Sequence, residues 1–154
     1  MSIKPFLQLI LRLLRYVHAL AGGAFILLII VLSMSATCFT VYQVDGHSMM
    51  TTLQNGQLLA VNLLAFKTTD PKVGDVVIVR YKGDPSIRFV KRVEAVPGMT
   101  VNFQGQALVL GSDQFFVEGD NRDFSTDSRV YGPVSRSNIV GAVMGLAAVD
   151  HGLQ

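Results

Sequence analysis

The sequence predicts an all-β domain, a partly closed barrel or sandwich of short strands, attached to one N-terminal transmembrane α-helix. Two observations support this fold class. Residues 16–44 contain no Lys, Arg, Asp or Glu over 29 consecutive positions, whereas a helix needs roughly 20 apolar residues to cross a bilayer. After residue 44, short runs rich in Val, Ile and Phe alternate with turns containing Gly, Pro, Asn and Asp, which is typical of β-strands. About 110 residues remain for this domain, enough for one.

The N-terminal part divides into a lead-in and a membrane anchor. Residues 1–15 combine apolar positions with cations and are expected to lie as an amphipathic segment on the cytoplasmic face. The anchor is expected over 16–43. Lys4, Arg12 and Arg15 precede it without any acid, so the positive-inside rule places the N-terminus in the cytoplasm and the domain on the far side. A cleaved signal peptide is the alternative, but the apolar run is long for its hydrophobic region.

The β domain is expected over 44–146 and is followed by a C-terminal tail, 147–154. No helical period of useful length follows residue 50. The runs that predict strands are 58–64, 75–81, 87–96, 99–103, 107–110, 114–119 and 138–144.

Charge and cysteine content exclude several classes of protein. Ten Lys or Arg and eleven Asp or Glu follow the span, so the domain is near neutral and nucleic-acid binding is not supported. Cys38 is the only cysteine, and no internal disulfide can form. Residues 123–134 begin with the spacing of a calcium loop, but Ser128 and Val134 occupy positions that need Gly and Glu. No Cys/His cluster suggests zinc, and we expect no metal and no cofactor.

Ser48, in "VDGHSMMTTL" just after the span, is a candidate nucleophile that lacks a suitable histidine. Neighbouring side chains of an extended segment point to opposite faces, so His47 does not easily reach the Ser48 hydroxyl. His18 lies in the span and His151 in the tail. A histidine-based triad is therefore disfavoured.

Lys91 is the remaining candidate base. Strand alternation places Phe89, Lys91 and Val93 on one face of the run 87–96. Burial among apolar groups lowers the pKa of a lysine, which is about 10.4 in water, and a neutral amine can accept a proton. The alternative is a lysine whose stem lies on the sheet while its ammonium reaches water. Periodicity alone favours this alternative.

Four segments occur in a fixed order after the span: "GHSMMTTL" (46–53), "VGDVVIV" (73–79), "RFVKRVEAVPG" (88–98) and "GDNRDFSTDSRVYG" (119–132). In this order and spacing the chain resembles the bacterial type I signal peptidases, a family of proteases with a serine–lysine dyad. The resemblance extends from the anchor to about Met144, and its last segment is the most specific. It implies a signal-peptidase-like β fold.

The resemblance implies roles for individual residues. Ser48 would be the nucleophile and its N–H an oxyanion donor, while Lys91 would be the neutral general base. Ser125 would hydrogen-bond the lysine amine and orient it. Asp127 and Arg129 would form a structural ion pair.

A second group of residues would support the site. Gly46 stands where some members have a serine as a second oxyanion donor, so this donor is either missing or supplied by the backbone. Met49 and Met50 would exclude water and touch lipid. Gly119, Asp120 and Asn121, at the start of the last motif, would have a structural role. The glycine is interpreted as a turn residue.

The implied activity is that of a membrane-bound serine endopeptidase that cleaves N-terminal signal peptides from exported preproteins, with small residues at −1 and −3. Its partners would be preproteins and the lipid bilayer, and its location the plasma (inner) membrane, single-pass. Thr51 replaces a proline common in the family, and Ala95 and Met99 replace a glycine and an acid, which fits a divergent relative with narrowed substrate choice.

Two alternatives stay open and a third is disfavoured. A dedicated pilin-processing peptidase of conjugation systems would share the dyad and the anchor. A membrane-tethered β module could bind a partner without catalysis. A self-cleaving repressor is disfavoured, because a membrane span stands here in place of a DNA-binding domain. The chain also lacks the large β insertion of longer members.

Overall fold

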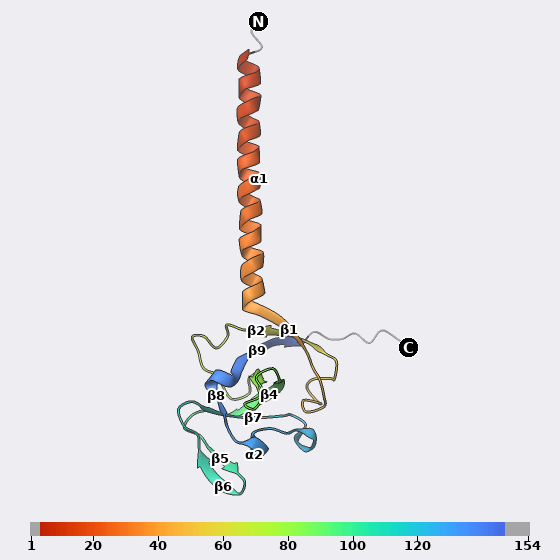
Figure 1. The fold of residues 1–154 in the computed structure, drawn as a ribbon, viewed down its shortest axis with the longest axis vertical. Helices are drawn as coiled ribbons and strands as arrows, with labels where there is room; N and C mark the ends of the chain where they lie inside the picture. Colours follow the sequence, from red (N-terminus) through yellow and green to blue (C-terminus); the bar gives the residue numbers. More distant parts are fainter. Residues whose placement is uncertain (1–3, 147–154) are drawn as a thin grey trace, which may run out of the picture. The chain divides into compact units, whose positions relative to one another are not determined.

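The structure is a computed structural model that describes residues 4–146 (Figure 1). The chain separates into two units, Met1–Thr37 and Cys38–Gln154. The first contains one continuous helix, α1, Lys4–Cys38. Within it, Arg12–Ser33 has a mean hydropathy of 2.2 over 22 residues and none of its window is buried against protein, so by length and composition it can cross a membrane.

The helix ends earlier than the predicted anchor. The prediction extended the anchor over 16–43, but α1 stops at Cys38 and Phe39–Gln43 forms strand β1. These five residues, FTVYQ, include four β-branched or aromatic side chains that favour strands, and they pair antiparallel with β2. A continuous apolar composition concealed this change from helix to strand. The predicted tail, 147–154, lies outside the described residues.

The second unit confirms the predicted all-β class. Its main sheet has seven antiparallel strands in the order β1-β2-β9-β3-β4-β7-β8, and β5 and β6 form a separate hairpin. Short helical segments lie between strands, among them α2, Ser128–Tyr131. The strands are β1 Phe39–Gln43, β2 Leu58–Asn62, β3 Val76–Arg80, β4 Arg88–Ala95, β5 Thr100–Phe103, β6 Gln106–Val109, β7 Gln114–Glu118, β8 Val134–Ser135 and β9 Ile139–Leu146.

Irregularities in the ladders bend the main sheet. Register shifts occur between Ala60 and Val61, between Ile78 and Val79, and within Val93–Ala95. Such bulges bend a strand and increase the local twist, and the sheet therefore wraps part of the way around its core. Figure 1 shows the β5–β6 hairpin at the end of this unit away from β1 and β2.

Both faces of the central strands are covered. Val77, Val79 and Val93 pack in one cluster with side chains of β7, β8 and β9. On the other face, Ile78 packs in a second cluster with Leu59 of β2 and residues of the turn after β1. The centre of β4 thus lies in the interior of the unit, which decides the environment of Lys91.

Candidate active site

Ser48 and Lys91, which are 43 residues apart in the sequence, meet in the structure. The distance between Lys91 Nζ and Ser48 Oγ is 2.7 Å. Ser48 lies in the turn after β1, and the next residue, Met49, fixes this turn by inserting into the core, where it is 1% exposed. Lys91 lies in the middle of β4, opposite Val77 of β3. The two groups expected to form a dyad are therefore within hydrogen-bond reach.

Lys91 does not extend its amine to bulk water. The residue is 2% exposed and is the only buried lysine or arginine in the described part of the chain. The interpretation that periodicity alone favoured, a lysine that reaches solvent, is wrong. Burial lowers the pKa of the Lys91 amine, Asp127 and Asp120 partly oppose this shift, and Arg129 adds to it. A lowered pKa increases the fraction of neutral amine, the form that can accept a proton.

Asn121 holds the backbone of the turn that carries Ser48. Its N–H donates to the Ser48 carbonyl at 2.9 Å, and its Nδ2 donates to the His47 carbonyl at 3.0 Å. Two bonds from one residue fix the turn against the segment that follows β7. The sequence predicted only a general structural role for Asn121. The two hydrogen bonds make it a positioning residue for the turn that carries Ser48.

Gly119 permits a close approach between this segment and the nucleophile turn. A Cβ at this position would lie 2.4 Å from the Ser48 carbonyl oxygen and 2.3 Å from Ser125 Oγ. The first of these atoms belongs to the backbone and cannot move aside as a flexible side chain could. The sequence indicated that Gly119 is a turn residue. The structure shows a packing requirement instead, because only glycine fits between Ser48 and Ser125.

We expect Gly119→Ala to lower kcat/KM for the peptide hydrolysis that the resemblance implies by about 100-fold, because the added methyl group displaces the turn that carries Ser48. The measurement is steady-state cleavage by the detergent-solubilised chain, with thermal unfolding recorded in parallel. Gly111→Ala is the matched control, since its Cβ would meet only the end of the Gln114 side chain at 3.4 Å. Unchanged kcat/KM in Gly119→Ala would show that this contact does not position Ser48.

The expected ion pair between Asp127 and Arg129 is present. Arg129 Nε donates to Asp127 at 2.9 Å, and the Gly119 N–H donates to the same carboxylate at 3.0 Å. Burial alone would raise the pKa of Asp127, but these hydrogen bonds outweigh it and lower the pKa to about 2. Asp120, for its part, is held by Arg92, with contacts of 2.6 Å and 2.8 Å. Asp120 and Asp127 therefore stay ionised and fix the backbone of the last motif.

Ser125 does not make the hydrogen bond to Lys91 that the resemblance implies. Its Oγ is buried and has no hydrogen-bond partner among the described residues. The hydroxyl lies against Gly119 and close enough to the Asp127 carboxylate to help lower the pKa of that group. In this structure Ser125 is therefore near the dyad without orienting the amine.

The Ser48 N–H is the candidate oxyanion donor in the turn. Within the described residues it has no hydrogen-bond acceptor. The Gly46 N–H, by contrast, already donates to Asn55 Oδ1 at 2.9 Å, so it does not supply the second donor here. Sequence reasoning missed Asn55, for which no motif gave a signal.

Thr51 has a φ of 99°, which proline cannot adopt, so the proline common in the family would not fit this turn as it is built.

The two methionines after Ser48 have different environments. Met49 is part of the core, so the expectation that it touches lipid is wrong: the side chain anchors the turn from inside. Met50 is 42% exposed. A run of adjacent apolar residues cannot reveal which of two neighbours faces the core until the turn geometry is known.

Two cavities adjoin Ser48. The larger, which we call the catalytic cavity, has a volume of about 450 Å³ and contains both members of the pair, with Tyr81, Phe89 and Tyr131 in its wall. The smaller has a volume of about 70 Å³ and is lined mainly by apolar side chains, among them Val44, Ile78 and Val90. Among the described residues, no group of three or more His, Cys, Asp or Glu could hold a metal ion.

A serine hydroxyl at hydrogen-bond distance from a buried amine is the arrangement expected of a serine hydrolase that uses an amine as its base. The model of the signal peptidase family, peptidase S26, matches residues 17–112 and 109–146. Because these matches cover most of the 154 residues, the chain belongs to the S26 signal peptidase family and is a peptide-bond hydrolase.

Individual relatives agree with this family. The chain is 28% identical over 161 residues to signal peptidase IB of Staphylococcus aureus (strain N315), covering 78% of this chain and 82% of that protein. It is 31% identical over 128 residues to a probable signal peptidase I-1 of Synechocystis sp., covering 64% and 65%. A crystal structure of a signal peptidase I from Enterococcus faecalis V583 is similar with a TM-score of 0.42 and 21% identity, covering 49% of this chain and 98% of that one.

Proposed function

We propose that the chain is a membrane-anchored endopeptidase that removes N-terminal signal peptides from exported preproteins, with Ser48 as the nucleophile and Lys91 as the general base. Membership in the signal peptidase family supports the reaction. The observation that carries the assignment of residues is the 2.7 Å distance between the Ser48 hydroxyl and a buried amine.

The proposed reaction follows from the state of that amine. Neutral Lys91 accepts the Ser48 proton while Oγ attacks the scissile carbonyl, and the Ser48 N–H donates to the oxyanion that forms. The resulting ammonium returns its proton to the leaving amine, which gives an acyl-enzyme. A water molecule, deprotonated by the same amine, then hydrolyses the ester.

The small cavity beside Ser48 supports a preference for small side chains before the cleaved bond. Its volume of about 70 Å³ suits a methyl-sized group and leaves little room for a large one, and Val44, Ile78 and Val90 provide apolar contacts in its wall. Small residues at −1 and −3 of the substrate would place one such group against this wall. The preference remains part of the proposal.

The proposed topology has the N-terminus in the cytoplasm and the catalytic unit outside it. The apolar segment Arg12–Ser33 is long enough to span a bilayer, and the cations before it favour this orientation. The bilayer would then hold the enzyme where the cleavage sites of membrane-inserted preproteins emerge.

The direct test is cleavage by the purified full chain in detergent. Preproteins with different signal peptides and a pilin precursor are supplied in parallel, and the new N-termini are determined by mass spectrometry. Cleavage of several preproteins after small residues supports a general signal peptidase, whereas cleavage of the pilin precursor alone supports a dedicated processing enzyme. Failure to cleave any of them would leave only a tethered β module.

A further inference from the structure

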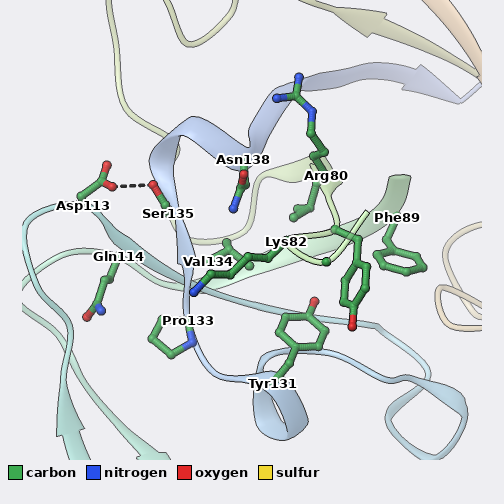
Figure 2. Close-up of a pocket in the computed structure, with 13 residues that line it drawn as sticks. Arg80, Lys82, Phe89, Asp113, Gln114, Tyr131, Pro133, Val134, Ser135 and Asn138 are labelled. Carbon is green, nitrogen blue, oxygen red and sulfur yellow. Dashed lines mark hydrogen bonds between the residues drawn. The ribbon is translucent and has the colours of Figure 1, made fainter. Parts of the chain in front are cut away.

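A third cavity, larger than the two that adjoin Ser48, lies next to the catalytic cavity. It has a volume of about 710 Å³ and is bounded on one side by the loop that joins β3 to β4 and on the other by residues around β8. We call it the hairpin cleft. Figure 2 shows Lys82 extending from the β3–β4 loop across this cleft toward Val134, while Arg80 points away from the centre of the group.

The hairpin cleft and the catalytic cavity share part of their wall. Tyr81, Phe89 and Tyr131 line both. Two cavities with three residues in common are neighbouring parts of one surface depression, so a chain bound at Ser48 can continue into the cleft. The Tyr131 side chain is part of both walls, and its hydroxyl is buried and makes no hydrogen bond within the described residues.

The polar groups of the cleft favour an acidic ligand. Arg80 and Lys82 line it, and neither forms an ion pair within the described residues. Asp113 is the single acid of the wall, and its carboxylate accepts a hydrogen bond from Ser135. Because Arg80 points away from the centre of the cleft (Figure 2), Lys82 is the cation that faces it, and an ammonium without an ion-pair partner attracts a carboxylate.

The pairing of β3 with β4 allows an estimate of the distance between Lys82 and the catalytic lysine. Val77 pairs with Lys91, and Lys82 follows Val77 by five residues. At about 3.3 Å per residue, Arg80, the last residue of β3, lies about 10 Å along the strand from Lys91. Lys82 lies two residues further, in the loop after β3, so its backbone is within about 17 Å of the catalytic lysine. An extended substrate would therefore span the distance with roughly five residues.

We propose that the hairpin cleft is a second substrate-binding site, which takes an acidic side chain of the preprotein about five residues from the cleaved bond and pairs it with Lys82. This inference rests on the proposed function, since it assigns the cleft to the same substrate chain. It adds a specificity determinant that depends on charge and lies outside the small pocket beside Ser48.

The test measures binding without turnover. The full chain carrying Ser48→Ala is titrated in detergent with fluorescent peptides that span a cleavage site, and the dissociation constant is obtained from anisotropy. A single Asp is placed in turn at each of about seven positions on either side of the cleaved bond, with Asn at the same position as the neutral reference. We expect one position at which Asp binds about fivefold more tightly than Asn, the size typical of a partly exposed ion pair.

Charge reversal identifies the partner. Adding Lys82→Glu is expected to abolish the preference for Asp at that position and to favour Lys there instead, whereas Lys72→Glu, on an exposed lysine outside both cavities, keeps the preference for Asp. High salt weakens the preference. A preference for Asp that survives Lys82→Glu, or no preference at any position while peptides still bind, would overturn the inference and leave the proposed function intact. Absence of binding by every peptide would overturn both.

Discussion

Replacement of Ser48 by Ala is expected to lower kcat/KM for signal-peptide cleavage by at least about 10⁴-fold, because the reaction then loses the atom that attacks the scissile carbonyl. The amine of Lys91 has no other hydroxyl at a hydrogen-bond distance within the described residues. The residual rate would come from substrate binding and the oxyanion donor alone. The fold is expected to persist, since Ser48 lies in a turn that Met49 and Asn121 hold by other contacts.

The measurement is steady-state cleavage of one preprotein by the parent and variant chains in the same detergent. Ser112→Ala, at an exposed position away from the catalytic cavity, serves as the control and is expected to retain the parent rate. If Ser48→Ala cleaves as fast as the parent, Ser48 is not the nucleophile.

The second large effect is expected at Lys91. Lys91→Met removes the basic nitrogen while keeping much of the side-chain volume, and Lys91→Arg replaces the amine with a group that stays protonated in proteins. Both are expected to lower kcat/KM by about 10³-fold or more. Lys91→Met is expected to unfold at the parent temperature or higher, because an apolar side chain at this buried position carries no desolvation cost.

The pH dependence of the parent enzyme follows from the same group. Its lowered pKa means that the amine becomes neutral at a lower pH than an ordinary lysine, and protonation removes the lone pair that accepts the Ser48 proton. Activity is therefore expected to rise along one limb as the pH increases through this pKa and to level off above it. A rate that stays constant over the whole pH range in which the chain remains folded would contradict a lysine base with a lowered pKa. Lys67→Met, at an exposed position, is the control and should keep the parent profile.

The strands were predictable because alternation and turn residues are local signals. Each predicted run overlaps one strand of the structure, from β2 at Leu58–Asn62 to β9 at Ile139–Leu146, although β6 begins one residue before its run and β9 continues two residues beyond its run. β1 was missed because its apolar residues continue the composition of α1 without a turn signal between them. β8 consists of only two residues, Val134–Ser135, too few to show any period.

The environment of Lys91 was only partly predictable. Alternation placed it correctly on the face of Val93, but it could not decide between a buried amine and one that reaches water. The answer depends on the turn that carries Ser48 and on the strands on either side of β4, all of which are distant in sequence. The resemblance to a family supplied this information before the structure did, since it paired Ser48 with Lys91 without any geometry.

The contacts of the last motif were the least accessible to sequence reasoning. That Gly119 packs against the Ser48 carbonyl and that Asn121 donates to both His47 and Ser48 are consequences of two segments about 70 residues apart meeting in the fold. No local pattern encodes such an approach. The missing bond between Ser125 and Lys91 is a difference of the same kind, since it depends on how one hydroxyl is placed against Gly119.

The central claim is that the Lys91 amine is deprotonated more readily than an ordinary lysine while it lies beside Ser48. The most direct measurement is an NMR titration of the full chain with isotope-labelled lysine side chains, in which the Lys91 signal is identified by its absence from Lys91→Met. The account predicts that Lys91 titrates clearly below the ordinary value of 10.5 while the exposed lysines do not. A Lys91 signal that titrates together with the exposed lysines would contradict it.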